Sequence, residues 1–157
     1  MANFAFNRGL GRGVEWAERV NASDPTNAVL VIMILAASGI ESDATLKDKD
    51  SFADIVAGAT NEVTNSGYTR KVIDQSGGIV ITYDDTNDRV DVDMPDQTWT
   101  AVAAGDGWSD LVIGYDPDST GGTDSAILPW SQHDFTTTPD GSDLVVQFPA
   151  TGFFRAS

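Results

Sequence analysis

The stretch Val29–Leu35, VLVIMIL, decides how this chain folds. Seven consecutive apolar residues, rich in Val and Ile, predict a strand that is covered on both faces. Their burial contributes on the order of 10–20 kcal/mol before chain entropy is subtracted, at roughly 1.5–3 kcal/mol per side chain. A membrane span is the competing interpretation, but the run from Ala28 to Ala37 is half of the about 20 residues that cross a bilayer. We therefore expect a core strand and no membrane association.

The composition indicates one β-rich domain. With 157 residues, 41% of them hydrophobic, the chain can bury a real core. Its acids are twenty Asp against four Glu, and it holds fifteen Gly and six Pro, a balance that favours turns over helices. Cysteine is absent, which excludes disulfides, thiolate nucleophiles and Cys-ligated zinc. We expect many short strands, tight turns and few helices.

The net charge of −15 is unevenly distributed. Residues 1–73 hold seven Lys and Arg against nine acids, whereas residues 74–154 hold fifteen Asp and one base, Arg89. Such an acidic surface repels nucleic acid, so no nucleic-acid partner is expected. A basic patch on a protein partner, or cations, would complement it, and solubility in a crowded assembly is the simpler explanation.

The first thirteen residues predict an extended N-terminal arm that precedes a domain at 14–157. Glycines at 9, 11 and 13 oppose a helix, and the arm carries basic and aromatic anchors. These anchors are Phe4, Phe6, Arg8 and Arg12. The arm either orders on a neighbouring subunit or tucks under its own domain. The beginning of the chain lacks the pattern of a signal peptide, so export by the general secretory route is not expected.

The remaining elements predict a mainly β fold. Apolar spacing favours a short helix at 14–20, and Ser51 is a plausible N-cap for another at 51–57 that Gly58 would close. Strands are expected at 68–73, 79–83, 89–92, 97–102, 111–115, 126–130 and 144–148, with a hairpin loop at 84–88. This spacing indicates an antiparallel β-sandwich or jelly-roll-like domain with one or two short helices.

Catalytic residues are scarce. His133 is the only imidazole, and Ser131 and Asp134 beside it suggest a hydrolytic triad. Residues two apart cannot easily form that relay, and no nucleophile motif is present. We expect an exposed loop histidine and no enzyme, with a hydrolase that uses His133 as a remote alternative.

Calcium binding is a minor hypothesis, and no cofactor is expected. Asp116, Asp118, Thr120 and Gly121 match the opening of an EF-hand loop, but Ile127 stands where a bidentate Glu is needed. A looser oxygen cage could form from one of two groups of aspartates. These groups are Asp84, Asp85 and Asp88, and Asp91, Asp93 and Asp96.

Tryptophans leave a carbohydrate-binding interpretation open. Trp99, Trp108 and Trp130 could form a platform that stacks on sugar rings, and Trp108, in a turn at 105–110, is the one expected to be exposed. Trp16 is the fourth tryptophan. Burial in a core or interface is the commoner fate of this residue.

The order of features resembles a family of small structural proteins in tailed-bacteriophage virions, which includes capsid decoration (cement) proteins. The resemblance covers about residues 27–156, and no single motif is diagnostic. The VLVIMIL strand is followed by a short helix and by a strand that contains Trp99. The matching segments are NEVT at 61–64, GYTR at 67–70, LVIGYD at 111–116, TPDGSDLVVQF at 138–148 and GFFR at 152–155.

The resemblance implies a role without chemistry on the capsid exterior of a virion. Such proteins bind the major capsid protein, commonly as homotrimers, and hold neighbouring capsomers together. The arm residues Phe4, Phe6, Arg8 and Arg12 are the first candidates for capsid or subunit contact. Tyr68, Arg70, Phe153 and Phe154 are second candidates that could equally belong to the core. A neck, tail or fibre component is the close alternative, and a glycan-binding module is the alternative of another class.

Overall fold

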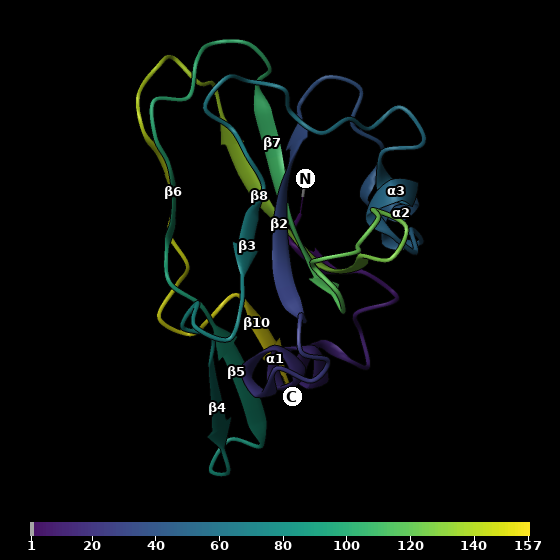
Figure 1. Ribbon diagram of the computed structural model, residues 1–157, viewed down its shortest axis with the longest axis vertical. Coiled ribbons are helices and arrows are strands. Elements are labelled where there is room, and N and C mark those ends of the chain that lie inside the picture. The colour runs from purple at the N-terminus through teal and green to yellow at the C-terminus, as the bar shows by residue number, and fades with distance from the viewer. Residues whose placement is uncertain (1) are drawn as a thin grey trace.

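The computed structural model describes residues 2–157, which form three antiparallel sheets with short helices (Figure 1). The chain is mainly β, as its sequence predicts. The five-stranded sheet has the order β1 (Phe4–Ala5), β8 (Leu128–Thr137), β7 (Trp108–Asp116), β2 (Val29–Ala36) and β3 (Lys71–Ile73). The others are β10 (Phe154–Ala156), β5 (Arg89–Asp93) and β4 (Val80–Asp84), and the pair β6 (Gln97–Trp99) and β9 (Leu144–Val146). The helices are α1 (Gly13–Ala22), α2 (Asp43–Lys47) and α3 (Phe52–Ile55).

Strand β2 lies inside the five-stranded sheet and is buried along its whole length, which confirms the prediction from VLVIMIL. Its side chains alternate between two cores because successive residues of a strand point to opposite faces. Leu30, Ile32 and Ile34 lie in one core. This core also contains residues of α1 and β5, and Phe153, the residue that precedes β10. The odd-numbered residues lie in the other, with Phe6 and residues of α2 and α3. Layers on both faces are consistent with a β-sandwich.

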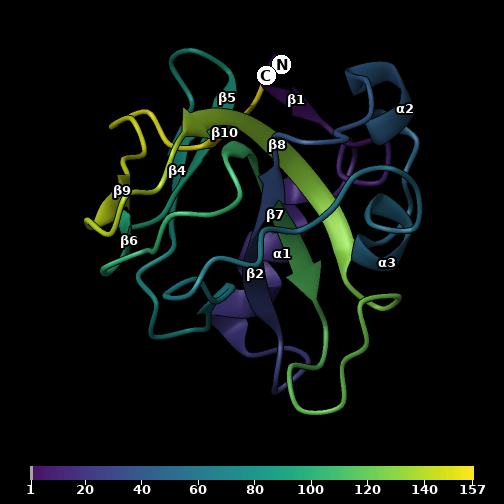
Figure 2. The same ribbon diagram turned by 90° about the horizontal axis from the view of Figure 1, so that it is seen from above.

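The helices cover the two faces of this sheet. Helix α1 contributes Trp16, Ala17 and Val20 to the first core. Helices α2 and α3 lie over the other face (Figure 1 and Figure 2), and the hydroxyl of Ser51 accepts the amide hydrogen of Asp54 at 3.1 Å, so the predicted N-cap is confirmed. The prediction that Gly58 closes this helix is wrong, because α3 already ends at Ile55.

The prediction of an extended arm is not confirmed for residues 2–13. Phe4–Ala5 pairs with β8 as an edge strand, and Phe6, whose side chain is 0% exposed, fills the core under α2 and α3. The sequence leaves open whether the segment orders on a neighbouring subunit or packs under its own domain. In the structure it packs against its own domain. Met1 is outside the described residues.

The strand predictions are confirmed in position but not in length. The hairpin at 84–88 joins β4 to β5, whereas β1 and β10 are not predicted at all. Sheets of five, three and two strands do not confirm a jelly-roll arrangement. In residues 2–157, no helix has the length and apolar character that crossing a bilayer requires.

Candidate functional site

The most exposed part of the predicted contact segment is the N-terminal turn, which we define as residues 7–12, between β1 and α1. Arg8 and Arg12 are exposed there, and Leu10, at 63%, is the most exposed large apolar side chain of the described chain. Sequence reasoning did not single out Leu10. The sequence pattern that could have indicated its exposure is a single apolar residue between two glycines and two arginines, with no other apolar residue beside it to form a core.

Backbone hydrogen bonds fix the shape of the N-terminal turn. The Asn7 amide donates to the carbonyl of Lys47 at 3.0 Å, which ties the turn to α2. The amide of Leu10 donates to the carbonyl of Phe6 at 3.1 Å, and Gly13 to Gly9 at 3.1 Å. A Cβ on Gly9 would lie 2.5 Å from the carbonyl oxygen of Trp130, so only glycine fits there. The exposed side chains are therefore presented from an ordered backbone.

The charges of this turn are weakly neutralised. Arg8 Nε lies 3.6 Å from a carboxylate oxygen of Asp50, and both side chains are about half exposed or more, at 48% and 70%. Such a pair contributes little in water. The side chain of Arg12 makes no ion pair or hydrogen bond to residues 2–157. Phe4, half-buried beside the turn, has Lys47 Nζ 5.0 Å from its ring centroid.

Tyr68 and Arg70, the second-rank candidates, lie in an internal polar network. The hydroxyl of Tyr68 donates to Glu62 Oε1 at 2.7 Å and accepts the amide hydrogen of Ile34 at 3.0 Å. Burial, followed by the charge of Glu62, raises the pKa of Tyr68, which keeps the phenol neutral. The Arg70 guanidinium bonds to the carboxylates of Glu62 and Asp124. Both residues thus bind parts of their own chain.

Phe153 and Phe154 pack on Trp130, with ring centroids 4.9 and 5.0 Å from its own. Phe153 is 7% exposed and belongs to the main core, while Phe154 is partly buried. Of the sequence candidates, Phe6 and Phe153 are therefore enclosed by their own chain. Arg8 and Arg12 are the ones left free to reach a partner.

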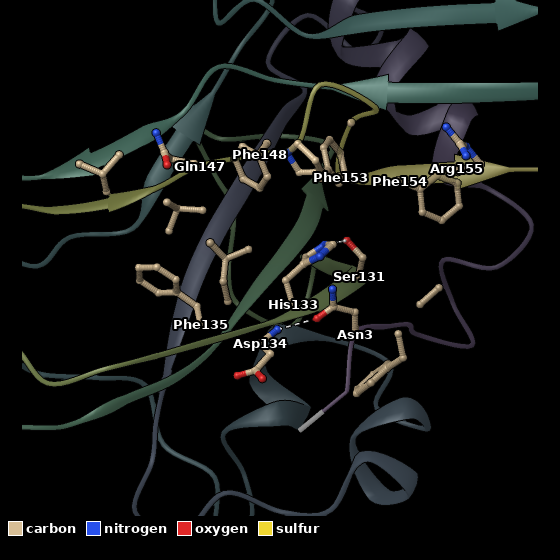
Figure 3. A pocket seen from close by; sticks show the side chains of 17 residues that line it. Asn3, Ser131, His133, Asp134, Phe135, Gln147, Phe148, Phe153, Phe154 and Arg155 are labelled. Carbon is tan, nitrogen blue, oxygen red and sulfur yellow. Dashed lines mark hydrogen bonds between the residues drawn. The ribbon is translucent and has the colours of Figure 1, made fainter.

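A cavity of about 570 Å³ lies between the two ends of the chain (Figure 3). Strands β1 and β8 form one wall, and the segment from β9 to β10 forms the other. The imidazole of His133 and the hydroxyl of Ser131 lie on the β8 wall. The cavity is thus built from residues of the N-terminal segment, of β8 and of the C-terminal segment.

His133 is a partly buried strand residue, so the prediction of an exposed loop histidine is wrong. Its Nε2 and the Ser131 hydroxyl are 2.9 Å apart, because alternate residues of a strand share a face. Burial lowers the pKa of His133 to about 4, so the imidazole is neutral near pH 7. Asp134 points away, and its Oδ1 accepts the hydroxyl of Thr136 at 3.0 Å. The structure brings together the serine and the histidine but not the acid of a triad.

Two of the aspartates considered for calcium, Asp84 and Asp91, pair with arginines. In the part of the chain that the structure describes, no three His, Asp or Glu gather in a way that could hold a metal ion. Asp84 pairs with Arg89 at 3.0 Å, and Asp91 with Arg155 through hydrogen bonds of 2.5 and 3.0 Å. These arginines supply the positive charge that a cation would otherwise bring.

The tryptophans offer no platform for sugar rings. Trp99, Trp108 and Trp130 are at most 1% exposed, so the expectation that Trp108 is exposed is wrong. The indole of Trp108 donates to Asn65 Oδ1 at 3.0 Å inside the core, and its ring meets that of Trp99 edge to face at 5.4 Å. The glycan-binding interpretation loses the residues on which it rested.

Comparison of the chain with protein-family models, curated proteins and solved structures found no match.

Proposed function

We propose that this chain is a virion structural protein, a capsid decoration or cement protein that binds the outer surface of a capsid and stabilises contacts between capsomers. The observation that carries the proposal is the N-terminal turn. It presents Arg8, Leu10 and Arg12 to solvent on a chain whose net charge is −15. The resemblance of the sequence to virion structural proteins supports the same role, in which the work is adhesion and no reaction is catalysed.

An ordered contact segment suits adhesion. Because the hydrogen bonds to Lys47, Phe6 and Gly9 already fix the turn, binding does not have to order it, and less of the interaction free energy is lost. Leu10 provides an apolar anchor, and the two arginines provide hydrogen-bond donors suited to carboxylates. A major capsid protein with an apolar depression rimmed by acids would be the complementary surface.

The experiment is co-sedimentation with emptied heads of the virus that encodes the chain. Leu10→Asp places a carboxylate at the centre of the turn and should lower occupancy at least tenfold. Val72→Asp is the matched control, since Val72 is 60% exposed on β3, at the opposite edge of the five-stranded sheet from β1. Full occupancy by the Leu10→Asp protein would refute contact through this turn.

Two further outcomes are informative. Sedimentation equilibrium of the free protein is expected to show a homotrimer, as the resemblance implies. Binding to purified tails or necks but not to heads would instead support the alternative that the chain is a neck, tail or fibre component. A protein that binds neither part would refute the virion role.

A further inference from the structure

The cavity between the chain ends is a binding site, and we propose that its ligand is a small, uncharged molecule with an aromatic ring and one hydrogen-bonding group. The proposal is independent of the virion role, because it rests only on the walls of this cavity. Its volume of about 570 Å³ falls within the range of about 300–1,000 Å³ typical of small-molecule sites.

Five phenylalanines line the walls and set the shape of the ligand. Phenylalanines come from three segments of the chain: one from β1, one from β8 and three from the C-terminal segment. Figure 3 labels those from β8 and the C-terminal segment. The five residues are Phe4, Phe135, Phe148, Phe153 and Phe154. Phenyl rings pack favourably against another aromatic ring in an offset or edge-to-face arrangement. The binding free energy of such a pair exceeds what the buried area alone would contribute. A flat apolar body therefore fits these walls better than a branched polar one.

The polar groups of the cavity make it selective for neutral molecules. His133 is uncharged near pH 7, and its Nε2 is engaged by Ser131, while Nδ1 makes no hydrogen bond to any residue in the described range 2–157. That nitrogen can serve one polar group of a ligand. A charged ligand would instead have to lose hydration among the phenylalanines, where the neutral imidazole offers it no opposite charge.

The charged residues at the rim already have partners. The guanidinium of Arg155 makes two hydrogen bonds to Asp91, and the Asp134 carboxylate bonds to Thr136. The charge of Arg155 is therefore balanced by Asp91, whereas the exposed Asp134 keeps its negative charge and points away from His133 and Ser131 (Figure 3). The amide of Asp134 donates to Asn3 Oδ1 at 2.8 Å, which holds the side chain of Asn3 at the opening. The one unbalanced charge of the rim is thus that of Asp134, which disfavours anionic ligands.

The test is ligand-detected NMR on the full chain with five probes that share a ring. Benzamide and phenol are neutral and polar, toluene is neutral and apolar, and benzoate and benzylammonium are charged. We expect saturation transfer to benzamide and phenol and at least tenfold weaker binding of both charged probes. Equal binding of charged and neutral probes, or no binding of any probe at millimolar concentration, would overturn the proposal.

Two tryptophan substitutions locate the site. Val145 lines the cavity and is 45% exposed, so Val145→Trp can obstruct the opening without entering the core. Val72→Trp adds the same ring on β3, at a residue outside the cavity lining. We expect Val145→Trp to weaken benzamide binding at least tenfold and Val72→Trp to leave it unchanged. Equal binding to the two variants would show that the probes bind elsewhere.

A third substitution tests the polar contact. His133→Leu keeps a side chain of similar size and removes the ring nitrogens. The preference for benzamide over toluene should fall at least fivefold in this variant, while toluene binding persists and reports that the cavity is intact. An unchanged preference would mean that His133 does not contact the ligand, and would refute the assignment of its role.

Discussion

Arg70 and Asp124, 54 residues apart in sequence, are joined by two hydrogen bonds of 2.6 and 2.9 Å. The same guanidinium donates to both carboxylate oxygens of Glu62, at 2.9 and 2.7 Å. One side chain thus connects the loop between β7 and β8 with the segment that precedes β3. The planar guanidinium makes this possible, because it can bond to two carboxylates at once.

Arg70→Lys should destabilise the protein although the charge is kept. A lysine ammonium cannot reproduce the bidentate bonds to both carboxylates, and the loss should be about 1–3 kcal/mol in the free energy of unfolding. Urea unfolding followed by circular dichroism measures it. Arg155→Lys is the control, since Arg155 also makes two bonds to one carboxylate but is more exposed, at 39% against 24%. An equal loss in both variants would contradict the bridging role of Arg70.

Gly9→Ala should destabilise the N-terminal turn. Its Cβ would lie 2.5 Å from the backbone oxygen of Trp130, which cannot move without disturbing β8. Overpacking of this kind typically costs about 1–3 kcal/mol. At Gly11, by contrast, nothing lies within 4 Å of an added Cβ, so Gly11→Ala should leave the melting temperature unchanged or slightly higher. Similar melting temperatures for the two variants would show that the turn is not fixed as described.

The imidazole of His133 should not titrate between pH 5.5 and 8. Its pKa in the folded protein is lowered to about 4 by burial, whereas the unfolded chain should have a pKa of about 6.5. Because the unfolded state binds the proton first, this residue lowers stability as pH falls from about 6.5 to 4, by at most about 1.4 kcal/mol per pH unit.

As the only histidine, His133 gives an unambiguous NMR signal. Its Cε1 proton shift should stay constant in the native protein down to about pH 5.5, and should titrate normally in 8 M urea. A native midpoint near 6.5 would mean that the ring is hydrated.

Native tryptophan fluorescence should be shifted to short wavelength and resist quenching by acrylamide. All four indoles are at most 2% exposed. Unfolding in urea should shift the emission to longer wavelength and increase quenching severalfold. Strong quenching of the native protein would indicate an exposed indole and would restore the possibility of a glycan platform.

The sequence predicts the centre of the fold better than its edges. The run at Val29–Leu35 has one plausible fate, burial on both faces, and the structure confirms it. The strands β1 and β10 are too short, at two and three residues, to show a periodic pattern. Each exists because a longer neighbour offers an unpaired edge, β8 for Phe4–Ala5 and β5 for Phe154–Ala156. Such pairing depends on tertiary structure that local sequence does not encode.

The candidate site is only partly predictable for the same reason. Basic residues beside glycines indicate an exposed segment, and Arg8 and Arg12 are exposed. Phe6 and Trp108 also lie close to glycines in the sequence but are 0% exposed, because their side chains pack into the two cores. The cavity is lined by residues 3–5, residues of β8 and residues between 145 and 155, so no single stretch of sequence predicts it.

A cryo-EM map of the intact virion is the most direct test of the proposed adhesion to a capsid. We predict density for this β-domain on the outer surface of the head, with Arg8, Leu10 and Arg12 facing the major capsid protein. Heads without this density, or density for the chain only at the tail, would contradict it.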